Sequence, residues 1–361
     1  MSVYIVLVVF LLLLYVVYPS KEMRGRLIVC SFLLLFILMG LREASVVGND
    51  SASSYRNHYL WINSRNVEYS IRGNSFFYII MKAFSALGLS YQFFIMFEAA
   101  FVCYSYARLV KKYSANPFLS TMWFIGMLYY SFLFSALKQA YAMAFICYAF
   151  DAIIQKKPIK FVICVVIASQ FHFPAAVFLP AYWIVKVNMD KHFLFLLFAM
   201  LIVVYFFRSI ILQFISDIYY GDENGYTYSN DAKFMGTKVI LMIMTIVAGV
   251  ILRKPDRQND FAYTSILAFM CISVVFQTFC YYNNIFERMA DYYYQFSILY
   301  IPMILEKDRI CMSYSGEKRK QNASTISTVG AIVIATFCIF NFLRYTLNDP
   351  ALNPFVFFWQ A

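Results

Sequence analysis

Three basic side chains, Arg42, Lys138 and Arg288, each stand at one end of an apolar stretch, where a cation can meet an anion at a membrane boundary. Arginine presents a rigid fork of donors that matches the oxygens of a phosphate, and lysine presents a point charge. Two or three such groups could hold a diphosphate without a metal ion. The residues therefore predict a diphosphate ligand whose lipid tail stays in the bilayer.

Asp50, His172 and Glu98 are the side chains of these regions that can accept a proton. Asp50 lies in a polar segment after Arg42, and His172 lies in the sequence F-H-F-P. Glu98 stands about 10 Å inside an apolar stretch, at about 1.5 Å per residue, where a carboxylate needs a partner. A carboxylate or imidazole within hydrogen-bond reach of a reacting group could remove a proton from it. The sequence leaves the order among the three open.

Four further polar residues, Gln139, Tyr55, Asn49 and Asp291, adjoin these groups in the sequence, and we expect them to contact the substrate. Tyr55 could stack on a sugar ring. Asn49 belongs to a Gly-Asn-Asp turn that folds its loop back toward the membrane. Simpler interpretations stay open: arginines at helix ends reach the interface by snorkelling, His172 could bond a carbonyl group, and Asp291 could pair with Arg288 one helical turn away.

The sequence predicts a site without cofactor or metal. It contains no D-x-D in the polar loops, no H-E-x-x-H and no C-x-x-C pair among its 8 cysteines, which mostly lie in apolar runs. Asp222 and Glu223 leave only a weak cation site open.

The composition decides which elements must position these residues. Of 361 residues, 62% are hydrophobic and only 14% charged, so the chain is expected to be a polytopic membrane protein. Its net charge of +11 comes from Lys and Arg in short loops, which orient a membrane protein. We therefore expect the lipid bilayer, and no nucleic acid, as a partner.

A helix needs about 20 residues to cross a bilayer. The apolar stretches that approach this length are residues 3–18, 26–42, 91–110, 117–135, 138–154, 193–215, 236–252, 261–280, 290–305 and 326–344. The positive-inside tendency is obeyed best when the long stretch 158–187 crosses twice, with a hairpin at Pro174, and when the short stretch 76–88 is a re-entrant or interfacial outer helix.

These stretches and the distribution of basic residues predict an all-α protein of about 12 transmembrane helices with both termini outside. Residues 1–361 form a single transmembrane domain without repeats, and the outer loops 43–90, 216–235 and 281–289 form the face that carries the site.

The sequence resembles the Wzy-type O-antigen and capsule polymerases, in particular their EpsG-like branch. The residues that carry the resemblance are Leu41-Arg42, the V-G-N-D segment from Val47 to Tyr55, Glu98, S-A-L-K-Q-A-Y-A at 135–142, F-H-F-P at 171–174, E-R-M-x-x-Y at 287–292 and N-P-x-x-F-F-W at 353–359. Two positions depart from the pattern: Lys138 stands where Arg is frequent, and Ser51 stands where Thr is frequent. The first keeps a cation and loses the bidentate fork.

The resemblance implies an architecture similar to the membrane-embedded GT-C glycosyltransferases. It implies that a growing glycan leaves undecaprenyl diphosphate and joins the non-reducing end of a lipid-linked repeat unit at the outer, periplasmic face of the bacterial inner membrane. In such an enzyme Arg42, Arg288 and Lys138 would bind the diphosphate, and Asp50, His172 or Glu98 would be the base. A Wzz-type chain-length regulator is the further partner that it suggests.

Two rivals share the diphosphate ligand: a lipid-linked oligosaccharide flippase or other transporter, and an O-antigen ligase. A flippase should place its charges along a midplane path between repeated halves. The basic residues of this chain that the positive-inside tendency does not explain instead gather toward one face, and no repeat is visible.

Overall fold

The computed structural model describes residues 2–360, except 21, 63–74, 188–194, 196–198, 201, 209, 211–235, 254–259, 281–283, 307 and 311–315. Within these parts the chain is helical, and an isolated bridge between Arg42 and Phe357 is the β-type pairing found there. The predicted all-α class is confirmed. About half of the predicted stretch 193–215, and the whole of the loop 216–235, lie outside the described residues.

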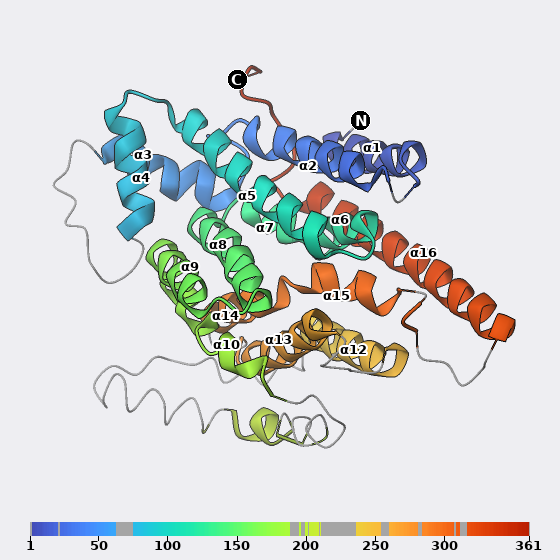
Figure 1. Ribbon diagram of the computed structural model, residues 1–361. Coiled ribbons are helices and arrows are strands. Elements are labelled where there is room, and N and C mark those ends of the chain that lie inside the picture. The colour runs from blue at the N-terminus through green and yellow to red at the C-terminus, as the bar shows by residue number, and fades with distance from the viewer. Residues whose placement is uncertain are drawn as a thin grey trace.

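The first half of the chain forms two groups of helices (Figure 1). Its elements are α1 (Val3–Val17), α2 (Arg24–Gly40), the π-helix η1 (Ser51–Tyr55), α3 (Arg56–Trp61), α4 (Ser75–Ala86), α5 (Tyr91–Tyr113), α6 (Pro117–Gly126), α7 (Tyr129–Leu133), α8 (Leu137–Ile154) and α9 (Pro158–Phe171). Helix α5 packs against α2 on one side and α8 on the other, so it joins the two groups.

The second half folds against α6, α8 and α9. Its described elements are the 3₁₀ helix η2 (Phe173–Phe178), α10 (Ala181–Ile184), α12 (Thr237–Leu252), α13 (Phe261–Gln277), α14 (Asn284–Tyr294), α15 (Ser297–Ile304) and α16 (Gly316–Asn348). Helix α16 crosses the molecule diagonally and packs mainly on α6 (Figure 1).

Three described helices are long and apolar enough to cross a membrane, namely Tyr91–Tyr113, Leu137–Ile154 and Gln321–Asn348. Other predicted spans are shorter or broken. The stretch 117–135 divides into α6 and α7 at Leu128, whose backbone is left-handed, and the stretch 290–305 divides into α14 and α15. The apolar helices indicate a membrane protein, and the count of 12 spans stays a prediction.

The predicted hairpin at F-H-F-P is confirmed. Helix α9 ends at Phe171, His172 is extended, and η2 begins at Phe173 with Pro174 in its first turn. The chain then returns along α9, because the Phe161 ring near the start of α9 lies 6.2 Å from that of Phe178, between centroids. The extended residue before Pro174 is what the proline ring requires.

The short helix α4 has 12 residues and packs against α9. At about 1.5 Å per residue it is too short to cross a hydrocarbon layer of about 30 Å. This agrees with a re-entrant or interfacial helix, and its position in the membrane stays a prediction.

The C-terminal tail packs against the loop that follows α2. The amide of Glu43 donates to the Val356 carbonyl at 2.7 Å, and the amide of Phe358 donates to the Leu41 carbonyl at 3.0 Å. The amide of Gly48 donates to the Ala351 carbonyl at 2.7 Å. Two of the sequence motifs from opposite ends of the chain are thus one structural unit.

Candidate active site

Arg42 lies at the centre of this unit and is 0% exposed. Its guanidinium donates to three backbone carbonyls, those of Val47 at 3.2 Å, Phe134 at 2.8 Å and Met39, and it stacks 4.7 Å from the centroid of the Phe134 ring. The side chain therefore joins the end of α2, the following loop and the start of the α8 region. Protein atoms cover the whole side chain of Arg42. Its contact with a diphosphate stays a prediction.

The turn after Arg42 depends on Gly48, whose φ is +103°. A Cβ atom there would lie 2.8 Å from the Phe134 carbonyl oxygen and 2.3 Å from the Ser51 hydroxyl. Glycine is required both for the positive φ and for this close approach. The amide of Asn49 donates to the Ser135 hydroxyl at 2.9 Å, and the Asn49 side chain is exposed. This turn starts the helical segment that carries Asp50 and Tyr55.

Tyr55 connects the segment to the rest of the site. Its ring packs edge-on against Phe77 of α4, and the Lys138 ammonium lies 5.6 Å from the Tyr55 ring centroid. Burial raises the pKa of Tyr55 to about 12, Asp50 adds to the rise, and the positive charge of Arg288 opposes it. Asp50 and Arg288 therefore both act electrostatically on Tyr55.

Lys138 lies in the first turn of α8, and its ammonium lies close to three aromatic rings. Its ammonium donates to the Tyr78 hydroxyl at 2.8 Å and lies 4.5 Å from that ring's centroid. Among the described residues, it forms no ion pair with a carboxylate. Aromatic faces and a hydroxyl hold the cation in place and leave its charge uncompensated.

His172 lies in the hairpin and is 8% exposed. Its Nδ1 atom is 2.6 Å from the Tyr292 hydroxyl of α14. Burial lowers the pKa of His172 to about 3, and the positive charges of Arg288 and Lys138 lower it further. His172 is therefore neutral at ordinary pH and lies in the electrostatic field of both cations.

Arg288 lies on the exposed side of α14. Its guanidinium makes no hydrogen bond or ion pair with the described residues, although Asp291 is one turn away. Asp291 instead accepts from Lys238 of α12 at 2.9 Å, and Lys238 also pairs with Glu287 at 2.9 Å. The alternative in which Asp291 pairs with Arg288 is therefore wrong, and the predicted contact of Asp291 with the substrate stays a prediction.

Glu98 and Gln139 are fully buried, and their side-chain oxygen and nitrogen atoms have no hydrogen-bond partner among the described residues. Glu98 of α5 lies in the field of Arg42. His172 lies in the field of Arg288 and Lys138. The predicted residues thus form two groups: Arg42 with Glu98, and Lys138 with His172, Arg288, Tyr55 and Asp50.

The second group brings together side chains from four separate segments, and we call Asp50, Tyr55, Lys138, His172 and Arg288 the cationic cluster. Sequence reasoning missed Tyr292 and Tyr78, which hold His172 and Lys138. Tyr292 ends the E-R-M-x-x-Y motif, but nothing in that motif indicated its contact with His172, and Tyr78 had no local signal among the many tyrosines of this chain. No group of three or more His, Cys, Asp or Glu side chains suited to a metal ion exists within the described residues.

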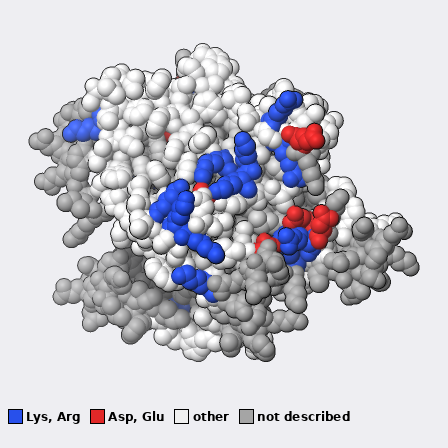
Figure 2. All heavy atoms as spheres, viewed as in Figure 1, with Lys and Arg blue, Asp and Glu red and all other residues white. Residues whose placement is uncertain are grey.

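Basic side chains also gather on the face shown in Figure 2, in the middle of a mostly uncharged surface. Many cations of the described residues are paired with carboxylates. Arg108 binds the buried Asp151 at 2.6 Å, with Lys112 and Tyr113 on its other oxygen. Arg253 binds Glu306 at 3.1 Å and also Asp260. Arg288 differs from these structural cations because it has no carboxylate partner among the described residues.

The helical fold of the described residues and their long apolar helices define a polytopic membrane protein. The sequence signature of the EpsG family matches residues 25–357, which is nearly the whole chain. The chain belongs to the EpsG family. Neither the curated proteins nor the solved structures contain a significant match to it.

Proposed function

We propose that the protein is a membrane-embedded glycosyltransferase of the polysaccharide polymerase type. Membership of the EpsG family supports a role in polysaccharide biosynthesis. The observation that carries the proposal is the cationic cluster, in which Arg288 and Lys138 both act on a buried, neutral His172. The donor would be a glycan on undecaprenyl diphosphate, and the acceptor the non-reducing end of a lipid-linked repeat unit.

The two cations fit the leaving group of this reaction. When the bond between the anomeric carbon and the diphosphate breaks, negative charge develops on the diphosphate oxygens. Arg288 can bind two of these oxygens through its fork, and Lys138 can neutralise a third. Neither has a carboxylate partner among the described residues that would have to be displaced first. The chemistry that these residues supply needs no metal ion.

His172 is the base that we propose for the acceptor hydroxyl. In the tautomer in which Nδ1–H donates to the Tyr292 oxygen, Nε2 keeps a lone pair for the incoming proton. Burial and, to a smaller extent, the two cations hold the pKa of His172 too low for an efficient base. A bound diphosphate would offset their charge and raise that pKa, so donor binding would activate the base. Asp50 is the alternative base within the same cluster.

Complementation of a deletion strain that makes long-chain surface polysaccharide tests this function. We expect the deletion to yield single capped repeats on a gel, and His172→Ala, Arg288→Gln and Lys138→Gln to leave that pattern at unchanged protein level. Arg309→Gln, at an exposed arginine outside the cluster, is the matched control and should restore a full ladder. Loss of all capped material would point to a flippase or ligase, and a full ladder from the deletion strain would refute the proposal.

The setting that we propose is a bacterial inner membrane with the cluster facing the periplasm. A chain-length regulator of the Wzz type would then control the modal length of the product. Cysteine substitution at the exposed residue Asn49 and labelling with an impermeant maleimide in intact cells tests the orientation. Labelling only after the membrane is opened would place the cluster on the cytoplasmic side and contradict it.

A further inference from the structure

A cavity of about 630 Å³ lies between α7, α12, α14 and α16. Arg288 and Arg344 line its polar part, together with the ion pairs that Lys238 forms with Glu287 and Asp291. Both carboxylates are already bound to Lys238. The two arginines have no hydrogen-bond or ion-pair partner for their guanidinium groups within the described chain. They are therefore the cavity's available cationic donors.

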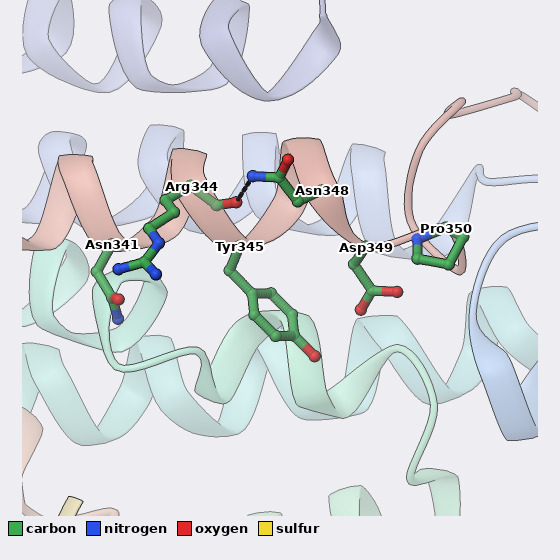
Figure 3. Close-up of a pocket in the computed structure, with 6 residues that line it drawn as sticks. All are labelled: Asn341, Arg344, Tyr345, Asn348, Asp349 and Pro350. Carbon is green, nitrogen blue, oxygen red and sulfur yellow. Dashed lines mark hydrogen bonds between the residues drawn. The ribbon is translucent and has the colours of Figure 1, made fainter. Parts of the chain in front are cut away.

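The cavity continues along α16. Asn341, Arg344 and Tyr345 line it and also line a second cavity of about 620 Å³ that extends to Asp349. Figure 3 shows the side chains of Asn341, Arg344 and Tyr345 projecting from the same side of α16. The Asn341 amide donates to the Gly126 carbonyl at 2.7 Å, which fixes this part of α16 on α6. Arg344 is thus presented at the junction of the two cavities.

The other lining of the first cavity is apolar and reaches the outer surface of the helices. Leu241, Phe337 and Phe340 line it, and Phe340 is 63% exposed. The neighbouring residues Ile332 and Val333 of α16 are 61% and 60% exposed. Only 11% of the apolar window of this helix is buried in the protein, so its free face meets lipid. The cavity therefore leads from two free arginines to an apolar, lipid-facing opening.

We propose that this cavity binds the diphosphate and the first isoprene units of a polyprenyl diphosphate, with Arg288 and Arg344 on the phosphates and Phe337 and Phe340 along the chain. The inference rests on the proposed function and adds Arg344 to the site. Because Arg288 also acts on His172, the attached sugar would extend from Arg288 toward His172 and away from α16. The substrate would enter sideways from the bilayer.

Binding to the purified full-length protein in detergent tests the site. The probes are geranylgeranyl diphosphate, its monophosphate and phosphatidylglycerol, and the measurement is native mass spectrometry. Charged hydrogen bonds of this kind correspond to at least a tenfold change in affinity each. We expect Arg344→Gln and Arg288→Gln each to weaken diphosphate binding about tenfold or more and to reduce the preference over the monophosphate. Arg309→Gln should bind normally.

Two further variants separate the parts of the proposal. Phe340→Asn should weaken geranylgeranyl diphosphate and leave the weaker binding of inorganic diphosphate unchanged. Arg344→Lys should retain the fold and recover part of the affinity, because it keeps the charge and loses the fork. Unchanged diphosphate binding by Arg344→Gln would overturn the site. Equal competition by phosphatidylglycerol would show a general lipid-headgroup site and would also overturn it.

The same experiment separates this site from the proposed function. His172→Ala should bind the diphosphate normally and make no polymer. If the arginine variants lose binding while His172→Ala still makes polymer, the site stands and the assigned base is wrong. If His172→Ala abolishes polymer while Arg344→Gln binds normally, the polymerase proposal stands and the cavity has been misassigned.

Discussion

Replacing Arg42 by lysine separates a structural role from a ligand-binding role. The arginine fork contacts the Met39, Val47 and Phe134 carbonyls at once and stacks on the Phe134 ring. A lysine ammonium keeps the charge but can reach at most one or two of these carbonyls in the same space. If Arg42 acts by holding these segments together, Arg42→Lys should lose stability even without any substrate.

The expected size of this loss follows from the contacts. A hydrogen bond to a charged group contributes about 1.5–3 kcal/mol, and a buried carbonyl without a partner adds a cost of about 1–3 kcal/mol. Losing two of the three contacts, at about 1.5–2 kcal/mol each, corresponds to about 3–4 kcal/mol. In a chain of this size that is a fall in melting temperature of roughly 5–10 °C.

The assay is thermal unfolding of a fluorescent fusion in detergent, followed by size-exclusion chromatography after heating. Wild type, Arg42→Lys, Arg42→Gln and the exposed control Arg309→Gln are compared at equal concentration. We expect the two Arg42 variants to melt earlier than the control and Gln to be the less stable of the two. An Arg42→Lys protein that melts with wild type and makes no polymer would refute the structural role and place Arg42 at the diphosphate.

Three further predictions follow from individual contacts. Gly48→Ala should lower the free energy of unfolding by about 1–2 kcal/mol for the left-handed backbone and by about 1–3 kcal/mol for the contact with Phe134. It should also shorten the polymer ladder at 37 °C, and a wild-type melting curve would contradict this. Asp151→Ala should lower stability by about 2–3 kcal/mol, because it strands Arg108, which is partly exposed, and unchanged thermal unfolding would show that solvent replaces the ion pair. His172 has a depressed pKa in the folded state, so its contribution to stability is complete above about pH 6.5 and is lost as the pH falls toward 3. At pH 5 wild type should have lost about 2 kcal/mol that His172→Asn does not lose, and equal acid sensitivity in chemical unfolding would argue against the low pKa.

The sequence predicted those parts of the fold that local patterns determine. Apolar length placed α5 and α8, and Pro174 placed the hairpin after α9. The break at Leu128 could not be predicted, because a left-handed leucine inside an apolar run leaves no local signal. The pairing of the tail with the loop after α2 was equally hidden, since it joins residues more than 300 positions apart, such as Glu43 and Val356.

The site divides in the same way. Residue type identified Lys138, His172 and Arg288, because ionisable groups near a membrane are costly and need a reason. Their partners are a matter of tertiary structure: Tyr292 comes from α14, Tyr78 comes from α4, and no spacing rule links either to its partner. Arg42 shows the limit of reasoning from type, because an arginine suited to phosphate is equally suited to three carbonyl oxygens.

Pairing is what distinguishes the cations of this chain from one another. Arg108, Lys238 and Arg253 each have a carboxylate within hydrogen-bond distance, so their charges form ion pairs within the fold. Arg288 and Arg344 line one cavity and have no such partner in the described parts of the chain, although Glu287 and Asp291 line it too and are bound to Lys238. Lys238 therefore has a second effect: it keeps the two carboxylates away from the arginines. Lys238→Met should release Asp291 to pair with Arg288, and an anion would then have to break that pair before it could bind. Weakened diphosphate binding by Lys238→Met would show that Lys238 keeps Arg288 and Arg344 available, because it binds the carboxylates of Glu287 and Asp291.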